Sequence, residues 1–414
     1  MPRGVLVCSL NVWACISLWA QAEPATSPAP EPGGRLAQWD SLRQKKAEEI
    51  RAPQRKGLEK ALYRFKEEHA MERLAAGWNG FHLLFGGLQT GSGFALGTEF
   101  RQERLARGVL DLRAGARGYL RQYEKWEFQI GMPRLYNEHV FLDFTTTYRN
   151  YPQSRYFGIG PQSRREDRTN FRLEDTTYLG SMGLKWKHWF RVGVRGGIIA
   201  ANTGPGTDSR YASIETVFRP SNTPALDFQP DHYQVGTFAQ MDWRDEPGNP
   251  RSGGNYLVQW NLFGDRNKSL YTFRRYDAEF QQYLPFFNRR RVIVFRAKTS
   301  LTDTSPGQTV PFYMMPTLGG SEDLRGFREF RFRDKNLMVY NLEYRWEVFS
   351  GLDMALFGDA GKVFGNRSDF SLDKLEGAYG IGFRFKQAKA VFLRIDLGHS
   401  REGTRIFFKF GHVF

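Results

Sequence analysis

From residue 77 to the end of the chain, apolar and polar residues alternate with a period of two. In the final segment, one face carries Ile406, Phe408 and Phe410, and the opposite face carries Arg405 and Lys409. A period of two predicts β-strands, because successive side chains of a strand point to opposite faces. About sixteen segments show the pattern, near 78–88, 91–101, 107–120, 123–135, 138–152, 175–189, 190–203, 231–246, 253–266, 271–287, 290–304, 336–349, 352–364, 377–389, 390–402 and 404–414.

Alternation alone fits two all-β architectures. A soluble sandwich turns its apolar face inward, whereas a membrane barrel turns that face toward lipid and its polar face toward the lumen. The runs of about 10–14 residues exceed the usual strand of 5–6 and resemble membrane-spanning strands. An even strand count and short links alternating with long ones (153–174, 204–230 and 305–335) also favour a barrel. We therefore predict a transmembrane antiparallel β-barrel of about sixteen strands over 77–414, with a short N-terminal helical segment.

The N-terminal region has a different character. Met1–Ala22 combines Arg3, an apolar stretch and a small-residue exit at Ala20 and Ala22, which predicts a secretory signal peptide. Residues 23–76 begin as a Pro-rich linker and continue as a Lys-, Glu- and Ala-rich stretch, which we interpret as a periplasmic helical segment. Such a helix can bind a partner, plug a lumen, or lie solvated beside its neighbours, and the sequence leaves these alternatives open.

The composition excludes a disordered chain and cysteine-based chemistry. Aromatic residues make up 15% of the chain and there are 43 glycines, too much apolar material for a disordered protein. The two cysteines, Cys8 and Cys15, lie in the predicted signal peptide, so we expect no disulfide and no thiolate chemistry in the mature chain. The net charge of +15 either favours anions such as the phosphates of lipopolysaccharide or balances acidic groups in a solvated lumen.

One long connection carries a specific sequence. Leu318–Phe327 reads Leu-Gly-Gly-Ser-Glu-Asp-Leu-Arg-Gly-Phe and resembles the signature loop of the BamA/TamA-type outer-membrane barrels, the bacterial surface antigen family. Three further segments resemble parts of that family and follow one another along the chain as they do there: Met241–Asp245 before this loop, and Asn341–Arg345 and Phe357–Gly361 after it. The resemblance implies a loop whose Arg-Gly-Phe tip folds back into the lumen. The C-terminal Phe408, Phe410 and Phe414 resemble the recognition signal of outer-membrane barrels.

The alternation supplies acidic partners for that tip. Glu343 and Asp359 both fall on the polar faces of neighbouring predicted strands, so both carboxylates are expected to face the lumen. We hypothesise that Arg325 binds them and holds the loop inside, that Gly326 permits the turn, and that Phe327 wedges against the wall. We call these five residues the loop lock. The alternative is that Arg325 caps a surface loop.

The resemblance implies a role in assembling outer-membrane proteins or translocating them across the bacterial outer membrane. Implied partners are outer-membrane lipid and lipopolysaccharide, a periplasmic accessory protein and unfolded barrel substrates; nucleic acid is not expected. Residues 23–76 are too short for a POTRA module, so we expect none, which keeps a passive pore or a structural surface barrel as the alternative. We predict no enzyme activity, no cofactor and no metal, because the sequence lacks nucleophile-elbow, zinc-helix and phosphate-loop motifs.

The first predicted strand is rich in glycine. Glycines weaken strand pairing, and this strand contains Gly80, Gly86 and Gly87. We therefore predict that the first and last strands pair weakly where they meet, at a boundary that we call the seam. The plain alternative is that these are ordinary wall glycines.

Overall fold

The computed structural model describes Trp39, Leu42 and the ranges 79–86, 95–119, 122–387 and 390–410. The predicted signal peptide, nearly all of the predicted helical segment and Phe414 lie outside the described residues. The chain divides into two compact units, Met1–Gly57 and Leu58–Phe414, and all of the described strands lie in the second. Among the described residues, no helix has the length and apolarity needed to cross a bilayer.

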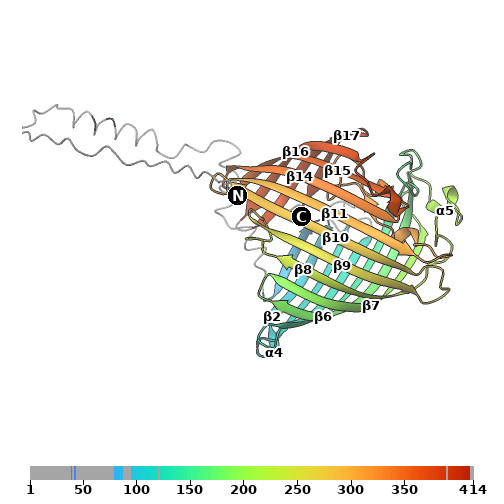
Figure 1. Ribbon diagram of the computed structural model, residues 1–414, viewed down its shortest axis with the longest axis horizontal. Helices are drawn as coiled ribbons and strands as arrows, with labels where there is room; N and C mark the ends of the chain where they lie inside the picture. Colours follow the sequence, from blue (N-terminus) through green and yellow to red (C-terminus); the bar gives the residue numbers. More distant parts are fainter. Residues whose placement is uncertain are drawn as a thin grey trace, which may run out of the picture. The chain divides into compact units, whose positions relative to one another are not determined.

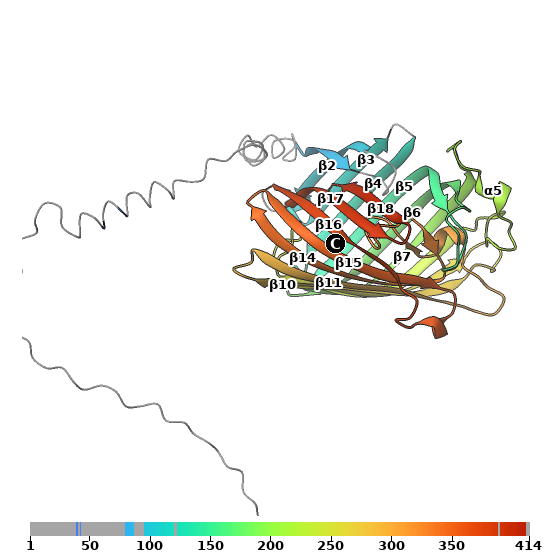
Figure 2. The same ribbon diagram turned by 90° about the horizontal axis from the view of Figure 1, so that it is seen from above.

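A single antiparallel sheet of sixteen strands dominates the second unit (Figures 1 and 2). Each strand pairs with its neighbour along the chain, except that β11 pairs with β14 because β12 and β13 lie in the connection between them. This result confirms the predicted all-β fold and its strand count. The strands are β1 (Phe81–Gly86), β2 (Ala95–Arg104), β3 (Leu110–Tyr119), β4 (Tyr123–Leu135), β5 (Val140–Tyr156), β6 (Thr169–Trp186), β7 (Phe190–Pro205), β8 (His232–Asp242), β9 (Gly253–Asp265), β10 (Phe273–Phe286), β11 (Arg291–Thr304), β14 (Asn336–Phe349), β15 (Leu352–Phe364), β16 (Glu376–Gln387), β17 (Ala390–Ser400) and β18 (Gly403–Lys409).

Smaller elements lie in the connections. The strands β12 (Thr317–Leu318) and β13 (Phe332–Arg333) form a separate two-stranded sheet within the long 305–335 connection. Short helical turns occur in other connections and at the start of this one: α4 (Leu105–Gly108), α5 (Ile214–Val217), η1 (Phe312–Met314) and η2 (Arg367–Asp369).

The polarity of the sheet decides between a sandwich and a barrel. On β14 and β15, Leu342 and Leu356 are 55% and 51% exposed, whereas the neighbouring Glu343 is fully buried. The same inversion recurs on β17, where Asp396 is fully buried and Leu397 is exposed. Apolar side chains thus cover the outer surface and charged ones fill the interior, as in a barrel in lipid and opposite to a soluble sandwich.

The first and last strands approach each other. A Cβ placed on Gly86 of β1 would lie 3.3 Å from the Cβ of Phe410, just beyond β18. Figure 2 likewise draws the blue and red ends of the sheet next to each other. No backbone ladder joins β1 to β18 within the described strands. The two edges therefore meet at a point of side-chain contact.

The predicted connection at 153–174 is wrong at both ends. The strands β5 and β6 stay paired within the predicted connection, through Tyr156 and from Thr169, and leave only 157–168 as a loop. The pairing register shifts between Tyr151 and Ser154, as at a β-bulge, and this shift breaks the alternation from which the strand ends were predicted. Beyond the shift, Ser154 and Tyr156 are both buried, so a polar and an aromatic side chain follow each other on the inner face. The hairpin therefore extends further than the alternating pattern indicated.

The long 305–335 connection packs against the inner wall. Its Leu318, Leu324 and Phe327 belong to a buried cluster that includes Val339 of β14 and Val363 of β15. Because each of these side chains is at most 1% exposed, their burial supplies a hydrophobic driving force for placing the loop inside. The packing positions the loop tip beside the charged side chains of the same wall.

Candidate functional site

The loop tip turns at Gly326. Its φ of +109° lies in the region that side-chain-bearing residues rarely adopt. A Cβ at this position would lie 3.0 Å from the carbonyl carbon of His399 on β17, so any other residue would force the tip or the wall to shift. The hydroxyl of Ser400 donates a hydrogen bond of 2.9 Å to the Gly326 carbonyl. Backbone conformation and close approach together require glycine here.

Arg325 lies between two carboxylates. Its Nε and Nη2 donate to the two oxygens of Asp359 at 2.8 and 2.7 Å, and its Nη1 donates to Glu343 at 2.7 Å. The Arg325 backbone N–H also donates to Asp359, at 3.0 Å, and the guanidinium lies 3.5 Å from the ring centre of Phe357. The structure therefore brings Arg325, Glu343 and Asp359 together, all at most 3% exposed. The planar fork of arginine suits this two-sided contact, which a lysine ammonium cannot reproduce.

The remaining sequence-predicted site residues have separate positions. Phe327 is fully buried, with its ring centre 5.4 Å from that of Phe332 in the same loop. It therefore packs within the loop's own core as well as against the wall. Phe408 is 65% exposed on the outer face, and Phe410 is half-buried beside Gly86. Phe414 lies outside the described residues.

The loop lock is part of a larger charge network that the sequence reasoning missed. Glu343 also accepts hydrogen bonds from Arg345 at 2.6 Å and from Arg384 at 3.0 Å. Arg384 continues to Asp396 at 2.6 Å, and Arg394 lies 2.6 Å from the same carboxylate. Four arginines thus surround three carboxylates, all of them at most 5% exposed. The alternation had placed these side chains on inward faces, but only the strand register determines which of them meet.

A second set of contacts holds the other side of the tip. Asp323 accepts from Arg296 at 2.9 Å and from Lys298 at 3.2 Å, both on β11. Burial opposes the charged form of Asp323, but Lys298 and Arg296 outweigh it and hold the pKa of this carboxyl below its ordinary value. Glu322 pairs with Lys409 of β18. The loop is therefore attached to the wall at β11, at β14–β17 and at the last strand.

Glu329 is a buried carboxyl of a different kind. It accepts a hydrogen bond of 2.9 Å from the Ser321 backbone N–H but has no ion pair among the described residues. Burial raises its pKa to about 8. At neutral pH the protonated, uncharged form therefore predominates. Within the described ranges, no group of three or more His, Cys, Asp or Glu side chains is placed to hold a metal ion.

The Met241–Asp245 segment continues into the turn between β8 and β9. Asp245 accepts N–H bonds from the backbone of Glu246, Arg251 and Ser252. Arg251 extends from this turn to Asp353 of β15 at 2.8 Å. The turn is thereby attached to the strands that carry the loop lock, at the opposite end of the strands from the 305–335 connection.

Comparison with known proteins places this architecture. Residues 112–413 match the Omp85 superfamily domain. The structure resembles BamA from Haemophilus ducreyi lacking POTRA domains 1-3, with a TM-score of 0.59 and 14% identity over 81% of this chain and 70% of that one. It also resembles CdiB from Escherichia coli, with a TM-score of 0.52 and 12% identity over 81% of this chain and 63% of that one, less than two thirds of its length. No curated protein sequence matches. The chain belongs to the Omp85 superfamily.

Proposed function

We propose that this protein is a bacterial outer-membrane barrel that assembles other outer-membrane proteins or translocates them across that membrane. Membership of the Omp85 superfamily and the fold likeness to BamA support the class. The observation that carries the proposal is the Arg325 tip held between Glu343 and Asp359 inside the sheet. A tethered loop that fills much of the lumen restricts flow through a passive pore, whereas it gives a barrel that handles substrates a closed resting state.

The proposed mechanism connects the loop to the edge of the sheet. The Glu322–Lys409 ion pair joins the loop to β18, which is the strand next to the seam. On the other side of the seam, β1 has only six residues and adjoins β18 without a ladder among the described strands. Opening such a seam breaks few hydrogen bonds, so a substrate strand can pair with the freed edges. The role assigns no catalytic step and no cofactor; its partners are unfolded barrel substrates, a periplasmic accessory protein, and the surrounding lipid and lipopolysaccharide.

Cross-linking tests the seam. A Cβ at position 86 lies 3.3 Å from the Cβ of Phe410, slightly closer than the roughly 3.5–4.5 Å of a disulfide, so a small shift of the two edges lets cysteines at these positions bond. We expect oxidation of Gly86→Cys/Phe410→Cys to abolish function and reduction to restore it. Gly86 has a φ of +144°, so Gly86→Ala/Phe410→Cys is the control for backbone strain. Full function in the oxidised double variant contradicts a seam that opens.

A passive pore is the second candidate, and one observation favours it. A cavity of about 1030 Å³ lies in the lumen beside the loop and is lined by several cationic side chains. Single-channel recording in planar bilayers separates the two functions. The assembly proposal expects a low conductance that rises in Arg325→Gln, whereas a stable, anion-selective, high conductance in the unaltered protein supports the pore.

Depletion of the protein tests the proposed function itself. We expect a drop in the levels of other outer-membrane proteins within a few generations, reversed by the unaltered gene but not by Arg325→Gln. Arg367→Gln is the matched control, because Arg367 is an exposed loop arginine with a single ion pair, to Asp303. Unchanged levels of every other outer-membrane protein would remove the assembly role.

A further inference from the structure

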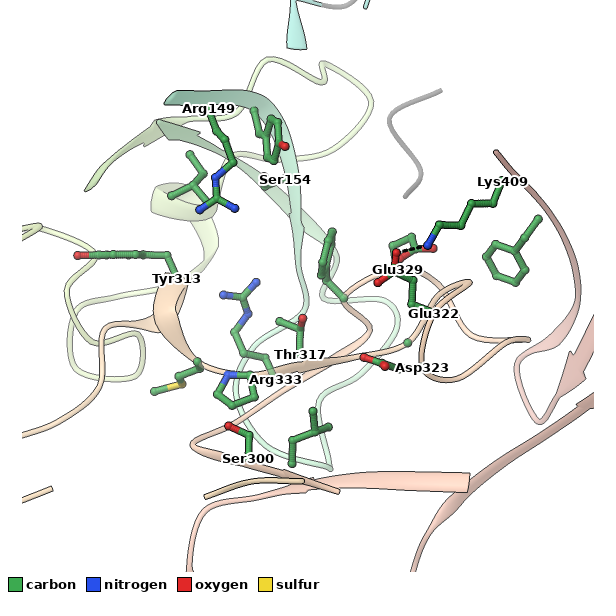
Figure 3. Close-up of a pocket in the computed structure, with 18 of the residues that line it drawn as sticks. Arg149, Ser154, Ser300, Tyr313, Thr317, Glu322, Asp323, Glu329, Arg333 and Lys409 are labelled. Carbon is green, nitrogen blue, oxygen red and sulfur yellow. Dashed lines mark hydrogen bonds and ion pairs between the residues drawn. The ribbon is translucent and has the colours of Figure 1, made fainter. Parts of the chain in front are cut away.

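The lumenal cavity lies between the 305–335 connection and the walls formed by β5, β10 and β18 (Figure 3). Most acids that line it are already neutralised. Asp323 pairs with Lys298, Glu322 pairs with Lys409, and Glu329 is largely protonated at neutral pH. Asp277 is the remaining acid of the lining. The positive charges of the lining therefore exceed the negative charges available to them.

Arg333 is the most unusual of these cations. It is 6% exposed and has no carboxylate partner among the described residues. Its Nη1 donates to the Phe312 carbonyl, but its buried Nε has no hydrogen-bond partner in the ranges that the structure describes. Its guanidinium carbon lies 5.6 Å from the ring centre of Tyr156 and 5.9 Å from that of Phe171. A buried guanidinium without a counter-charge is costly, and this cost makes Arg333 a strong site for an anion.

Two further arginines face the same cavity. Figure 3 shows the Arg149 and Arg333 side chains projecting into one space from opposite sides. Arg149 binds Asp175 through Nε and Nη2, at 2.6–3.1 Å, which leaves its Nη1 edge for a ligand. Arg275 donates from Nη2 to the Met314 carbonyl at 2.7 Å and forms no ion pair within 4.0 Å among the described residues. The three guanidinium groups come from β5, β10 and the loop.

The polar atoms without partners share one property. Besides Arg333 Nε, four other atoms of the lining are buried and have no hydrogen-bond partner in the described part of the chain: Arg117 Nε and the hydroxyls of Ser154, Ser300 and Tyr313. All five atoms can donate a hydrogen bond. A hydroxyl also accepts hydrogen bonds, but a guanidinium Nε only donates, so Arg333 Nε requires an acceptor. A ligand that accepts hydrogen bonds and carries negative charge satisfies all of these atoms, whereas a cation is repelled by the guanidinium.

We propose that this cavity is a binding site for a phosphate group, with Arg333 and Arg149 as its charged ligands and Ser154 as a donor. Guanidinium forks match the geometry of phosphate oxygens. The volume exceeds that of one phosphate, and Phe171, Leu173 and Met315 offer apolar surface to whatever carries it. The phosphate is either free in solution or part of a lipid headgroup.

Binding has a structural consequence beyond occupancy. Arg333 belongs to β13 in the loop, whereas Arg149 and Ser154 belong to β5 in the wall. A bound phosphate therefore bridges the loop to β5, away from the β14–β17 wall that holds Arg325. It stabilises the inserted loop without touching the loop lock, so phosphate becomes a ligand that favours the closed state.

The test uses the purified full-length protein in a zwitterionic, phosphate-free detergent. Isothermal titration with inorganic phosphate is compared with titration of dihexanoyl phosphatidic acid, at constant ionic strength set with sodium chloride. We expect saturable binding and a rise in melting temperature. Arg333→Gln is expected to weaken binding by about tenfold or more, as for a lost charged hydrogen bond, and Ser154→Ala by several-fold. Arg274→Gln, on the exposed face beside Arg275, is expected to change nothing.

The two arms distinguish the sources. Binding in both arms with similar affinity assigns free phosphate, and tighter binding of the phosphatidic acid assigns a lipid headgroup. Absence of saturable binding in both arms overturns the site. So does a result in which Arg333→Gln and Ser154→Ala both bind as tightly as the unaltered protein. If Arg333→Gln does not fold, Ser154→Ala decides: several-fold weaker binding supports the site, and binding as tight as that of the unaltered protein overturns it. The outcome is independent of the assembly role, because it measures binding alone.

Discussion

Replacing Arg325 with glutamine tests the loop lock quantitatively. The change keeps most of the side-chain length but removes the charge and the bonds to Glu343 and Asp359. Glu343 retains Arg345 and Arg384. Among its described partners, Asp359 retains only the Asn341 amide, at 2.8 Å, and the backbone N–H of residue 325, at 3.0 Å, neither of which carries a charge. Breaking a buried ion pair on one side costs about 3–5 kcal/mol. The equilibrium between inserted and released loop should therefore shift about a hundred- to several-thousandfold toward release.

Limited trypsin digestion of the folded barrel reports this shift. The loop contains Arg328 and Arg331 as cleavage sites that remain after the substitution. We expect the unaltered loop to resist cleavage and Arg325→Gln to be cut there while the strands stay intact. Arg345→Gln is the matched control, because Arg345 binds the same Glu343 but comes from the wall. Cleavage in Arg345→Gln should stay low, and Arg325→Lys should fall between, since it keeps the charge without the fork.

Two results would refute the reasoning. If Arg325→Gln and the unaltered protein are cut at the same rate, the ion pairs do not hold the loop. If Arg345→Gln releases the loop as strongly as Arg325→Gln, the network stabilises the barrel as a whole and Arg325 has no special role. The melting temperature of each variant separates loop release from general unfolding.

Further predictions concern the loop's own interior. The buried, protonated Glu329 favours the inserted loop, and this contribution is fully present below the ordinary pKa of 4.5 and is lost as pH rises through about 8, so trypsin sensitivity should increase as the pH rises toward about 8 and level off above it. Glu329→Gln should flatten that dependence, and an unchanged pH profile would contradict the assignment. Phe327→Ala should lower the free energy of unfolding by about 3–5 kcal/mol because the side chain is fully buried. Urea titration measures this loss, and a change below about 1 kcal/mol would place Phe327 outside the core.

Much of the fold was accessible from the sequence because the barrel wall obeys a single rule. Strict alternation gave sixteen strands, and the structure has one strand for each predicted segment. The rule failed at the β5–β6 hairpin, where the register shift after Tyr151 changes which residues face inward. A pattern of period two does not indicate where such a shift occurs, so the full length of the hairpin could not be predicted from the sequence.

The candidate site divides in a similar way. The alternation of polar and apolar residues placed Glu343 and Asp359 on inward faces, and the family resemblance indicated that the tip carrying Arg325 folds into the lumen. Arg384 and Asp396 were also on predicted inward faces, but their contact depends on the stagger between β16 and β17, which no local pattern encodes. Arg333 gave no signal at all, because its burial results from how the 305–335 connection folds upon itself.

Cysteine labelling in intact cells tests the central claim, a loop held inside an outer-membrane barrel. Leu324 at the loop tip is fully buried, whereas Leu372, in the connection between β15 and β16 at the same end of the barrel, is 69% exposed. With a membrane-impermeant maleimide, we predict rapid labelling of Leu372→Cys and protection of Leu324→Cys, with protection lost when Arg325→Gln is added. Equal labelling of the two cysteines in the otherwise unaltered protein, or no labelling at position 372, would contradict the account.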